Sequence, residues 1–193
     1  MKKYFFPAIK LFIILTIITG VLYPLSITLF ANIFYPDKSK GSMITNKGKL
    51  IGSELIGQKF SSDKYFWARP SAVDYNPMPS GGSNYGPTSK ALLDSVNARK
   101  DLIVKHNFVT TPSLQNIPKD LLFASASGVD PDISPEAAYF QIDRIAKARN
   151  YNESQKKGLN KLVDDNILNP QFGLFGIPRV NVILLNIKLD ELK

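Results

Sequence analysis

Apolar and polar residues divide the chain sharply near its beginning. Residues 11–34, with the sequence LFIILTIITGVLYPLSITLFANIF, form a run without a charged side chain. A helix rises about 1.5 Å per residue, so this run spans about 36 Å, more than the roughly 30 Å hydrocarbon core of a bilayer. The pattern predicts a basic tail over residues 1–10, a transmembrane helix over 11–34 and an extramembrane domain over 35–193.

Two other interpretations of the apolar run fit less well. A cleavable signal peptide has an apolar core of about 7–15 residues and ends at a small-x-small site, whereas this run is longer and has no such site near its end. A helix buried in a globular core rarely has this length without a charge. Hydroxyl groups in the run bond either to their own helix or to partner transmembrane helices, and both alternatives stay open. The polar residues of the run are Thr16, Thr19, Ser26, Thr28 and Asn32.

The side of the membrane that the domain occupies is a hypothesis. Three lysines precede the apolar run and four follow it by residue 49, so the positive charges show no clear bias. Long domains translocate largely regardless of charge. We therefore expect a cell-membrane protein that spans the bilayer once, with its N-terminus in the cytoplasm and its domain outside.

Mixed periodicities after residue 35 favour an α+β fold. Apolar segments flanking Asn46-Lys47-Gly48 predict a small β-hairpin over residues 42–52. Helices are predicted over residues 88–105, 134–149 and 153–166, and the second begins with a capping Ser134, then Pro135. Alternating apolar residues over 179–189 predict a C-terminal strand.

Proline and glycine positions predict the irregular parts of the domain. They gather over residues 70–87 and 110–132, which we expect to be loops. The aromatic residues 65–67 indicate a short strand or a docking turn.

Charge and composition limit the function. The chain has 24 Lys and Arg against 16 Asp and Glu, for a net charge of +8. These charges are scattered and form no basic block, which gives no support to nucleic-acid binding, and a basic face near lipid headgroups is a sufficient explanation. The absence of cysteine excludes a disulfide framework, and a single histidine excludes a His/Cys metal cluster, so no metal site is predicted.

Sequence patterns of catalysis are missing. The chain has neither a G-x-x-x-x-G-K-[ST] phosphate loop nor the Asp-Lys-Thr-Gly-Thr sequence of ion pumps. His106 closes a helical stretch, where we expect it to contact terminal carbonyls. Asp130 and Asp132 flank a proline and are expected to act in capping and solvation. No catalytic residue is therefore assigned.

Two short segments are candidates for binding. Glycines and small polar residues can turn backbone N–H groups towards an anion or a partner carbonyl, although the same composition also suits a flexible loop. The weak cofactor-binding candidates of this kind are Ser80, Gly81, Gly82, Ser83 and Asn84. Aromatic and arginine side chains are enriched at interface hot spots, although aromatic residues in a core are the alternative. The candidates for a subunit interface are Tyr65, Phe66, Trp67, Arg69, Asn84 and Arg179.

Five ordered motifs carry a family resemblance. They are GSELIGQ at 52–58, YFWARPSA at 65–72, SGGSNYGP at 80–87, ASASGVDPDISP at 124–135 and GIPRVNV at 176–182. The set resembles the small C subunit of the Kdp potassium-transporting P-type ATPase and covers nearly the whole chain. Ala68, Ala126 and Asp132 stand where that family commonly has Gly, Gly and His.

The resemblance implies a non-catalytic accessory subunit of an ATP-driven potassium import pump. Its partners in that family are a channel-like potassium-binding subunit, an ATP-hydrolysing P-type subunit and a very small single-helix subunit. The C subunit of the family is described as needed for assembly and as a catalytic chaperone that raises the ATP affinity of the hydrolysing subunit. No cofactor of its own is implied, because ATP acts through the complex.

The route by which the chain affects ATP depends on its orientation. A domain outside the cell cannot touch cytoplasmic ATP, so its effect is expected to be indirect, through a conformational equilibrium shared with the pump subunit. A cytoplasmic domain would allow direct contact through residues 80–84. Without the resemblance, the alternative function is a free-standing, membrane-tethered extracytoplasmic binding module. An isolated enzyme ranks third, because no nucleophile and base can be nominated.

Overall fold

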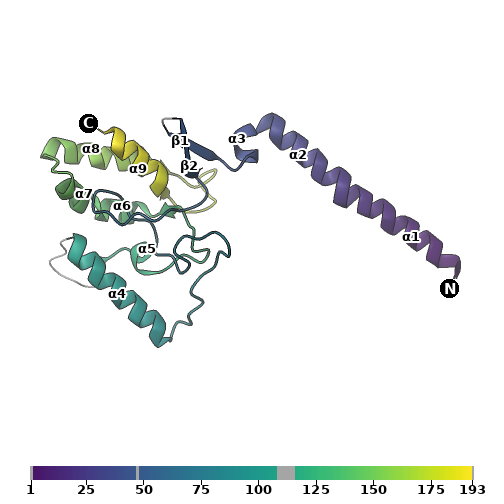
Figure 1. Ribbon diagram of the computed structural model, residues 1–193, viewed down its shortest axis with the longest axis horizontal. Helices are drawn as coiled ribbons and strands as arrows, with labels where there is room; N and C mark the ends of the chain where they lie inside the picture. The colour runs from purple at the N-terminus through teal and green to yellow at the C-terminus, as the bar shows by residue number, and fades with distance from the viewer. Residues whose placement is uncertain (1, 47, 108–115, 193) are drawn as a thin grey trace. The chain divides into compact units, whose positions relative to one another are not determined.

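The computed structural model describes residues 2–46, 48–107 and 116–192. The chain divides into two compact units, Met1–Ser53 and Glu54–Lys193. The first contains the long apolar helix and a hairpin, and the second is a mixed domain of helices and one small sheet (Figure 1). The predicted α+β class is therefore confirmed. Lys47 of the predicted hairpin turn and residues 110–115 of the predicted second loop lie outside the described residues.

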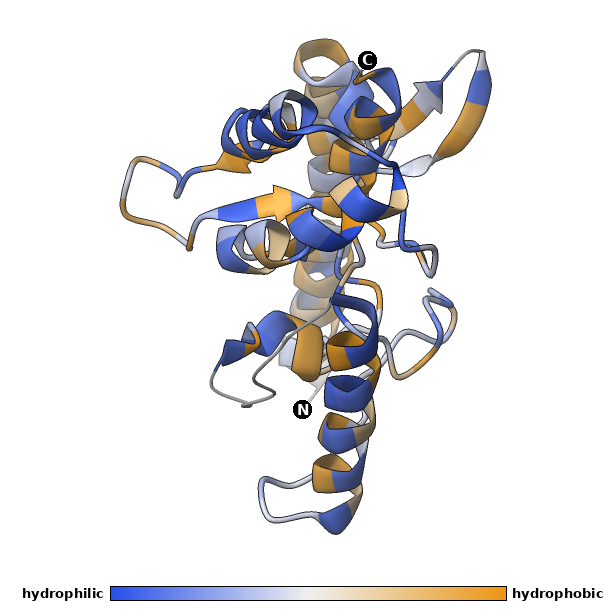
Figure 2. Cartoon of the chain, turned by 90° about the vertical axis from the view of Figure 1, so that its left-hand side faces the viewer, coloured by the Kyte–Doolittle hydropathy of each residue, from blue (hydrophilic) through white to orange (hydrophobic). Residues whose placement is uncertain are grey.

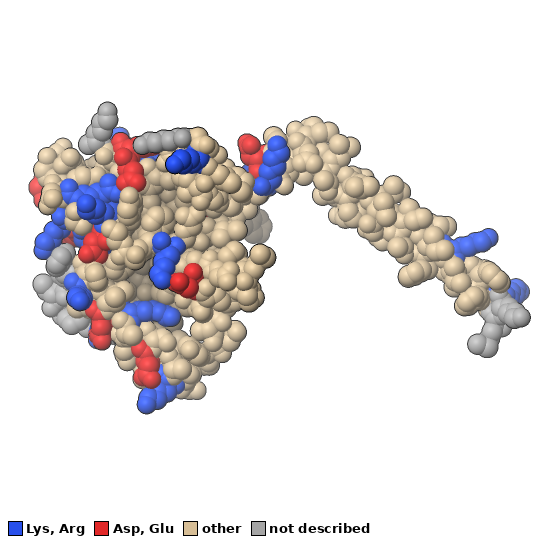
Figure 3. Space-filling view, viewed as in Figure 1, with Lys and Arg blue, Asp and Glu red and all other residues tan. Residues whose placement is uncertain are grey.

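One continuous helical rod begins the first unit. It consists of α1 (Lys2–Ile17), a short π-helical turn η1 (Ile18–Leu22) and α2 (Tyr23–Phe34). Within it, the 32 residues of Lys3–Phe34 are long and apolar enough to cross a membrane, and they include the predicted span. Figure 3 shows this rod almost free of charged side chains beyond its basic beginning.

The π turn is explained by Pro24. Proline has no N–H to donate, and its ring crowds the carbonyl four residues earlier. The backbone widens to accommodate it, so that the N–H of Tyr23 donates to the carbonyl of Ile18, five residues back. The helix continues through the proline instead of ending there.

Hydroxyl groups in the rod bond to their own helix. Thr19 Oγ1 donates to Leu15 O at 2.7 Å and Ser26 Oγ donates to Leu22 O at 2.6 Å. Thr28 Oγ1 does the same at 2.8 Å from the carbonyl of Pro24. The sequence left open whether the hydroxyls bond to their own helix or to partner helices, and these three donate to their own helix.

The hairpin predicted after the apolar run is confirmed. A single helical turn, α3 (Pro36–Ser39), leads into β1 (Met43–Asn46), which pairs antiparallel with β2 (Lys49–Ser53). Met43 lies opposite Ser53, and the register shifts at Ile44 and Thr45.

The second unit builds its helices around a three-stranded antiparallel sheet. The strand order is β3-β5-β4, in which Val180 lies between Ile133 and Ile167. The strands are β3 (Asp132–Ile133), β4 (Ile167–Leu168) and β5 (Arg179–Asn181). The helices are α4 (Lys90–Asn107), α5 (Lys119–Leu122), α6 (Pro135–Phe140), α7 (Ile142–Ala148), α8 (Glu153–Asp164) and α9 (Val182–Glu191).

Helix prediction succeeds where an apolar stripe and a cap coincide. The N–H of Ala137 donates to Ser134 Oγ at the start of α6, as the sequence predicts. Asn152 caps α8 in a full capping box: its side chain accepts the N–H of Gln155, and the side chain of Gln155 accepts the N–H of Asn152. The buried faces of α7, α8 and α9 form the centre of the core, which includes Ile145, Leu159, Val163, Leu185 and Leu189.

The helix predicted over 134–149 is broken at Gln141. The carbonyl of Ala137 accepts the Gln141 side-chain amide at 3.0 Å, and the Gln141 N–H turns to the carbonyl of Ala138. A side chain that enters the backbone ladder in this way ends one helix and starts the next.

The predicted C-terminal strand is wrong beyond Asn181. Only Arg179–Asn181 are extended, and α9 follows immediately. The Asn181 side chain accepts the N–H groups of Ile183 and Leu184, which starts the helix. Val182, Leu185, Asn186 and Leu189 are buried, and this spacing of three and four residues is helical. Seven of the eleven residues over 179–189 are apolar, and their order fits both the strand period and the helix period, so the alternation alone predicted the wrong structure.

Candidate functional site

Residues 65–67 lie at the centre of the domain without forming a strand. Side-chain amides bind the backbone groups of this segment, as a neighbouring strand would in a sheet. Asn186 of α9 accepts the Phe66 N–H at 2.8 Å and donates to the Phe66 carbonyl at 3.0 Å. Gln141 accepts the Trp67 N–H at 2.7 Å and donates to the Trp67 carbonyl at 3.2 Å. Backbone groups that would otherwise be buried without partners are therefore satisfied by one side chain from α9 and one from the junction between α6 and α7.

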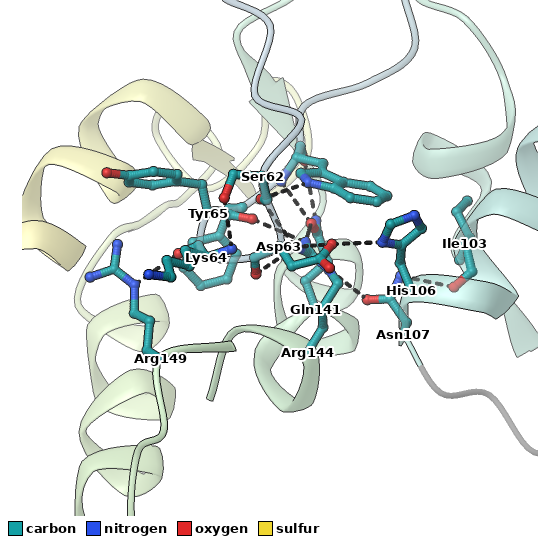
Figure 4. A network of polar contacts seen from close by, with 12 residues as sticks. Ser62, Asp63, Lys64, Tyr65, Ile103, His106, Asn107, Gln141, Arg144 and Arg149 are labelled. Atoms are coloured by element: carbon teal, nitrogen blue, oxygen red, sulfur yellow. Dashed lines mark hydrogen bonds and ion pairs between the residues drawn. The ribbon is translucent and has the colours of Figure 1, made fainter. Parts of the chain in front are cut away.

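Arg144 of α7 holds the same segment from the other side. Its guanidinium is buried and donates to the carbonyls of Asp63 at 2.8 Å and Tyr65 at 3.0 Å. It also donates to Gln141 Oε1 at 2.6 Å and to Asn107 Oδ1 at 3.1 Å. Figure 4 shows these contacts converging on Arg144 from three separate parts of the chain.

The electrostatics of Arg144 follow from its burial. Desolvation lowers its pKa to about 10, while the carboxylate of Asp63, 3.8 Å away, acts in the opposite direction. The side chain therefore remains a cation at neutral pH. Its guanidinium also lies 4.2 Å from the centre of the Trp67 ring, a favourable cation–π distance.

His106 contacts a carboxylate, whereas its position at a helix end predicts contact with terminal carbonyls. Its Nδ1 lies 2.8 Å from Asp63 Oδ1, and its ring packs edge-on against Trp67 at 5.2 Å. The Trp67 Nε1–H donates to the carbonyl of Ser62 at 3.0 Å. The loop brings the carboxylate of Asp63 within reach, and a carboxylate is a stronger acceptor than a helix-end carbonyl.

Tyr65 connects the segment to the C-terminal helix. Its hydroxyl donates to Asp190 Oδ2 at 3.0 Å, and Arg149 Nη2 pairs with Asp190 Oδ1 at 2.6 Å. The hydrogen bond to Asp190 is the largest cause of a raised pKa for Tyr65. The Arg149 guanidinium also covers the Tyr65 ring at 5.1 Å.

One of the interface candidates is a core residue. Phe66 is 0% exposed and packs in the centre of the domain, so its side chain offers no surface to another subunit. Tyr65 and Trp67 are half-buried and keep part of their rings at the surface. The alternating directions of side chains in an extended segment explain the difference between neighbours.

The two candidate arginines pair with the Asp-Pro-Asp motif. Arg69 Nη1 lies 3.0 Å from Asp130 Oδ2, and Arg179 Nε lies 2.8 Å from Asp132 Oδ2. Burial raises the pKa of Asp132, and Arg179 opposes this effect. These carboxylates therefore have ionic partners within the chain, beyond the capping and solvation that the sequence predicts.

The glycine-rich segment packs backbone to backbone against another motif. The Gly81 N–H donates to the carbonyl of Ser127 at 2.9 Å. A Cβ at Gly82 would lie 2.9 Å from the Ala126 carbonyl, and one at Gly128, where φ is +72°, would lie 2.7 Å from the carbonyl of Gly81. Two motifs separated in sequence thus approach too closely for side chains. Ser80 and Asn84 are exposed at the ends of the loop.

A cavity of about 310 Å³ lies beside Trp67. Its walls are largely apolar, and they come from the segment after residue 59, from α4 and from α5. Charged groups at the cavity have partners already: Lys59 pairs with Asp74 at 2.6 Å, and Arg99 donates to the carbonyl of Leu122 at 2.8 Å.

Sequence reasoning missed the residues that organise this site. Arg144, Gln141 and Asn186 were not candidates, although each makes several contacts to residues 62–67. Asn186 carried a signal, as a lone amide inside an apolar stretch. Gln141 and Arg144 are polar residues inside the helix predicted over 134–149, and no local pattern distinguishes them from its surface residues.

The fold defines a class of protein, with one candidate membrane helix joined to one mixed α+β domain. Residues 5–191 match the sequence model of the family described as KdpC, the K+-transporting ATPase c chain. The chain is 48% identical to the potassium-transporting ATPase KdpC subunit of Polynucleobacter asymbioticus, over 98% of this chain and 99% of that one. It is also 48% identical to the KdpC subunit of Leptospira interrogans, over 95% and 92% of the two chains. The chain belongs to the KdpC family.

Proposed function

We propose that this chain is a non-catalytic, membrane-anchored subunit of a potassium-transporting ATPase. The family match carries the proposal, because it extends over residues 5–191 and so includes the apolar helix as well as the domain. Its relatives bear the name of a subunit of that ATPase. The partners we propose are a channel-like potassium-binding subunit, an ATP-hydrolysing P-type subunit and a very small single-helix subunit.

The polar side chains around residues 62–67 make structural contacts within the domain, which supports a binding role for the chain and not a catalytic one. Arg144 and Gln141 hold backbone groups of residues 62–67, and Arg149 joins Lys64 to Asp190. Arg69 and Arg179 are paired with carboxylates. Such groups stiffen the domain, and a stiff domain suits a role in assembly.

We propose further that the chain raises the ATP affinity of the hydrolysing subunit indirectly. An extracytoplasmic domain would favour one conformation of the channel-like subunit, and that conformation would favour ATP binding across the membrane. A tenfold change in affinity requires only about 1.4 kcal/mol of coupling. The proposed contact residues are Tyr65, Trp67, Arg69, Asn84 and Arg179.

Co-purification with an activity assay tests the subunit role. A tag at the C-terminus, mild detergent and potassium-starved cells should yield this chain together with a large ATPase and a channel-like protein. The eluate should hydrolyse ATP faster when potassium is added. The complex prepared without this chain should show a raised KM for ATP. A single band without activity would exclude the subunit role.

Cysteine labelling tests the orientation. Because the chain has no cysteine, Ser83→Cys and Lys3→Cys each introduce a single thiol. With the domain outside, a membrane-impermeant maleimide should label Ser83→Cys in intact cells and leave Lys3→Cys unlabelled until the cells are opened. The reverse result would place the domain in the cytoplasm and make direct nucleotide contact at residues 80–84 the better hypothesis.

A second candidate is a free-standing, membrane-tethered binding module. The observation that favours it is the apolar cavity beside Trp67, whose size suits a small ligand. The same co-purification separates the two, since a module of this kind needs no ATPase partner.

A further inference from the structure

The connection between β4 and β5 carries an unusual surface. Residues 166–178, NILNPQFGLFGIP, which comprise β4 and its connection to β5, contain no charged side chain. Four large apolar residues of this connection stand out in water: Phe172 is 92% exposed, Leu174 80%, Phe175 67% and Ile177 71%. Figure 2 shows the connection projecting from the sheet with a mostly apolar colour. Contiguous apolar surface of this kind usually marks an interaction site.

The connection is held in one shape by its own backbone. Gln171 and Phe175 exchange both N–H···O bonds, at 2.9 and 3.0 Å, and the Gly173 N–H donates to the carbonyl of Pro170 at 3.0 Å. Gly173 has a φ of +71°, which suits glycine at this tight turn. A preformed shape loses little conformational entropy on binding, which favours affinity.

The base of the connection is equally fixed. Val180 of β5 is fully buried between the neighbouring strands. Arg179 beside it is paired with Asp132 at 2.8 Å. The four apolar side chains therefore project from a rigid support, and no rearrangement of the core is needed to present them.

The chemistry of the connection favours a protein partner over a lipid surface. Membrane-surface elements combine apolar residues with Lys or Arg for the headgroups and with Trp or Tyr at the interface. Residues 166–178 contain none of these four residue types. Phenylalanine instead is enriched in the cores of protein interfaces.

The size of the surface argues against pairing with a second copy. A fully buried aromatic side chain contributes about 150–250 Å², so Phe172 and Phe175, which are 92% and 67% exposed, offer about 240–400 Å² between them. The smaller Leu174 and Ile177 add less than that. A stable interface needs about 800 Å² on each partner. The connection thus suits an anchor inside a larger interface and is too small to hold a dimer by itself.

We propose that residues 171–177 form an apolar knob that inserts into an apolar hollow on a membrane-embedded subunit of the same ATPase. This inference rests on the proposed function, which supplies the partner. The four exposed side chains enter the hollow, and the uncharged flanks let the two surfaces close without burying a charge.

Photo-crosslinking in the intact complex tests the knob. Leu174→p-benzoylphenylalanine places a reactive ketone at its tip, and Met78→p-benzoylphenylalanine is the matched control, because Met78 is 81% exposed on a different loop. On illumination, the Leu174 variant should give an adduct with another protein subunit, and the Met78 variant should give none. Adducts with lipid alone, with a second copy of this chain, or equally at both positions would overturn the proposal.

Removal of the apolar side chains gives a second readout. The double variant Phe172→Ser/Leu174→Ser should lower the amount of co-purified ATPase by about tenfold or more, which corresponds to losing an interface anchor. Met78→Ser should leave the yield unchanged. If the wild-type chain and the double variant capture the ATPase equally well, the knob is refuted and the proposed function is retained. Failure of the wild-type chain to capture any ATPase refutes the proposed function.

Discussion

Arg144 is a buried cation whose partners are mostly neutral. The nearest carboxylate oxygen, on Asp63, is 3.8 Å away, and the close contacts are to carbonyl and amide oxygens. Burial of such a group is costly unless its N–H donors have acceptors. Here the donors bind the carbonyls of Asp63 and Tyr65, which would otherwise lack a partner. Arg144 and the aromatic segment therefore stabilise each other.

We expect Arg144→Met to destabilise the domain by about 3–4 kcal/mol, because it leaves the carbonyls of Asp63 and Tyr65 without their donor. Urea unfolding of the full chain in mild detergent, followed by the fluorescence of Trp67, measures this directly. Arg149→Met is the comparison variant, and it should cost less, about 1–2 kcal/mol, because its ion-pair partner Asp190 is half-exposed and Arg149 donates to only one close backbone carbonyl, that of Lys64. Equal costs for the two variants would contradict a special role for Arg144.

Tyr75 gives the domain a pH dependence at alkaline pH. Its hydroxyl donates to the carbonyl of Arg69, and desolvation raises its pKa to about 12. An unfolded tyrosine titrates near pH 10, so the stabilisation from this group is complete below that pH and is lost as the pH rises towards 12.

The variant Tyr75→Phe should therefore cost about 1 kcal/mol at pH 8, where a hydrogen bond is removed. Between pH 10 and 12 this difference in unfolding free energy should fall by up to about 2 kcal/mol, so that it passes through zero and the variant becomes the more stable protein. Thermal unfolding across this range supplies the measurement, with Tyr85→Phe on an exposed ring as the control. A difference that stays constant with pH would rule out Tyr75 as the titrating group.

Prediction from sequence is weakest at the residue scale. The Asp63–His106 contact joins positions 43 residues apart, and nothing in the local pattern of either segment indicates it. Arg144 follows Asp143, whose carboxylate pairs at the surface with Lys156, and only the tertiary fold distinguishes the two neighbours. Partners of buried polar groups are fixed by the whole chain, so local periodicity does not reveal them.

At the scale of elements, the switch from β5 to α9 depends on Asn181. Its Oδ1 accepts two N–H groups at the start of α9, and its amide donates to the carbonyl of Glu54 at 2.8 Å. The strand β5 ends and the helix α9 begins at Asn181, whose side chain caps the helix and also binds the carbonyl of Glu54. The sequence over 179–189 fits either structure, and the cap decides where the strand ends.

We expect Asn181→Ala to destabilise the domain by about 1–2 kcal/mol, through loss of the cap and of the bond to Glu54. Asn181→Asp should recover part of this loss, since it keeps the capping oxygen beside a helix N-terminus. Circular dichroism during thermal unfolding tests both variants. If the aspartate variant is no more stable than the alanine variant, capping is not the main contribution.

Elements with strong local signals were predicted well. The hairpin, α4 and the serine cap of α6 combine turn chemistry or capping with a clear apolar stripe. Helix α8 forms as predicted, although Gly158 weakens its signal in the sequence. The strands β3 and β4 are two residues long, and no periodicity can be recognised at that length. The α5 turn lies in a stretch that its prolines predicted to be a loop.

At the scale of the molecule, composition was sufficient to predict the division of the chain into an apolar helix and a polar domain. An uncharged run long enough for a bilayer, followed by a polar domain, predicts an anchor and an α+β unit. The structure has an α+β domain and a helix long and apolar enough to cross a membrane. The projecting knob escaped prediction because sequence alone does not show which apolar residues remain outside the core. Figure 3 shows acidic and basic side chains interspersed over the face in view, in agreement with the scattered charge of the sequence.

The local bonding of the hydroxyls in the apolar helix leads to a last prediction about assembly. Because each of these groups donates to its own backbone, we expect the triple variant Thr19→Val/Ser26→Ala/Thr28→Val to remove no bond to a partner helix. We expect the variant to stay in the membrane and to co-purify with the ATPase within about twofold of wild type, since apolar packing between helices is retained. A chain that begins at residue 35 is the control, and it should leave the membrane fraction because the span is absent. Loss of the ATPase from the triple variant, with the chain still in the membrane, would show instead that these hydroxyls bond across to partner helices.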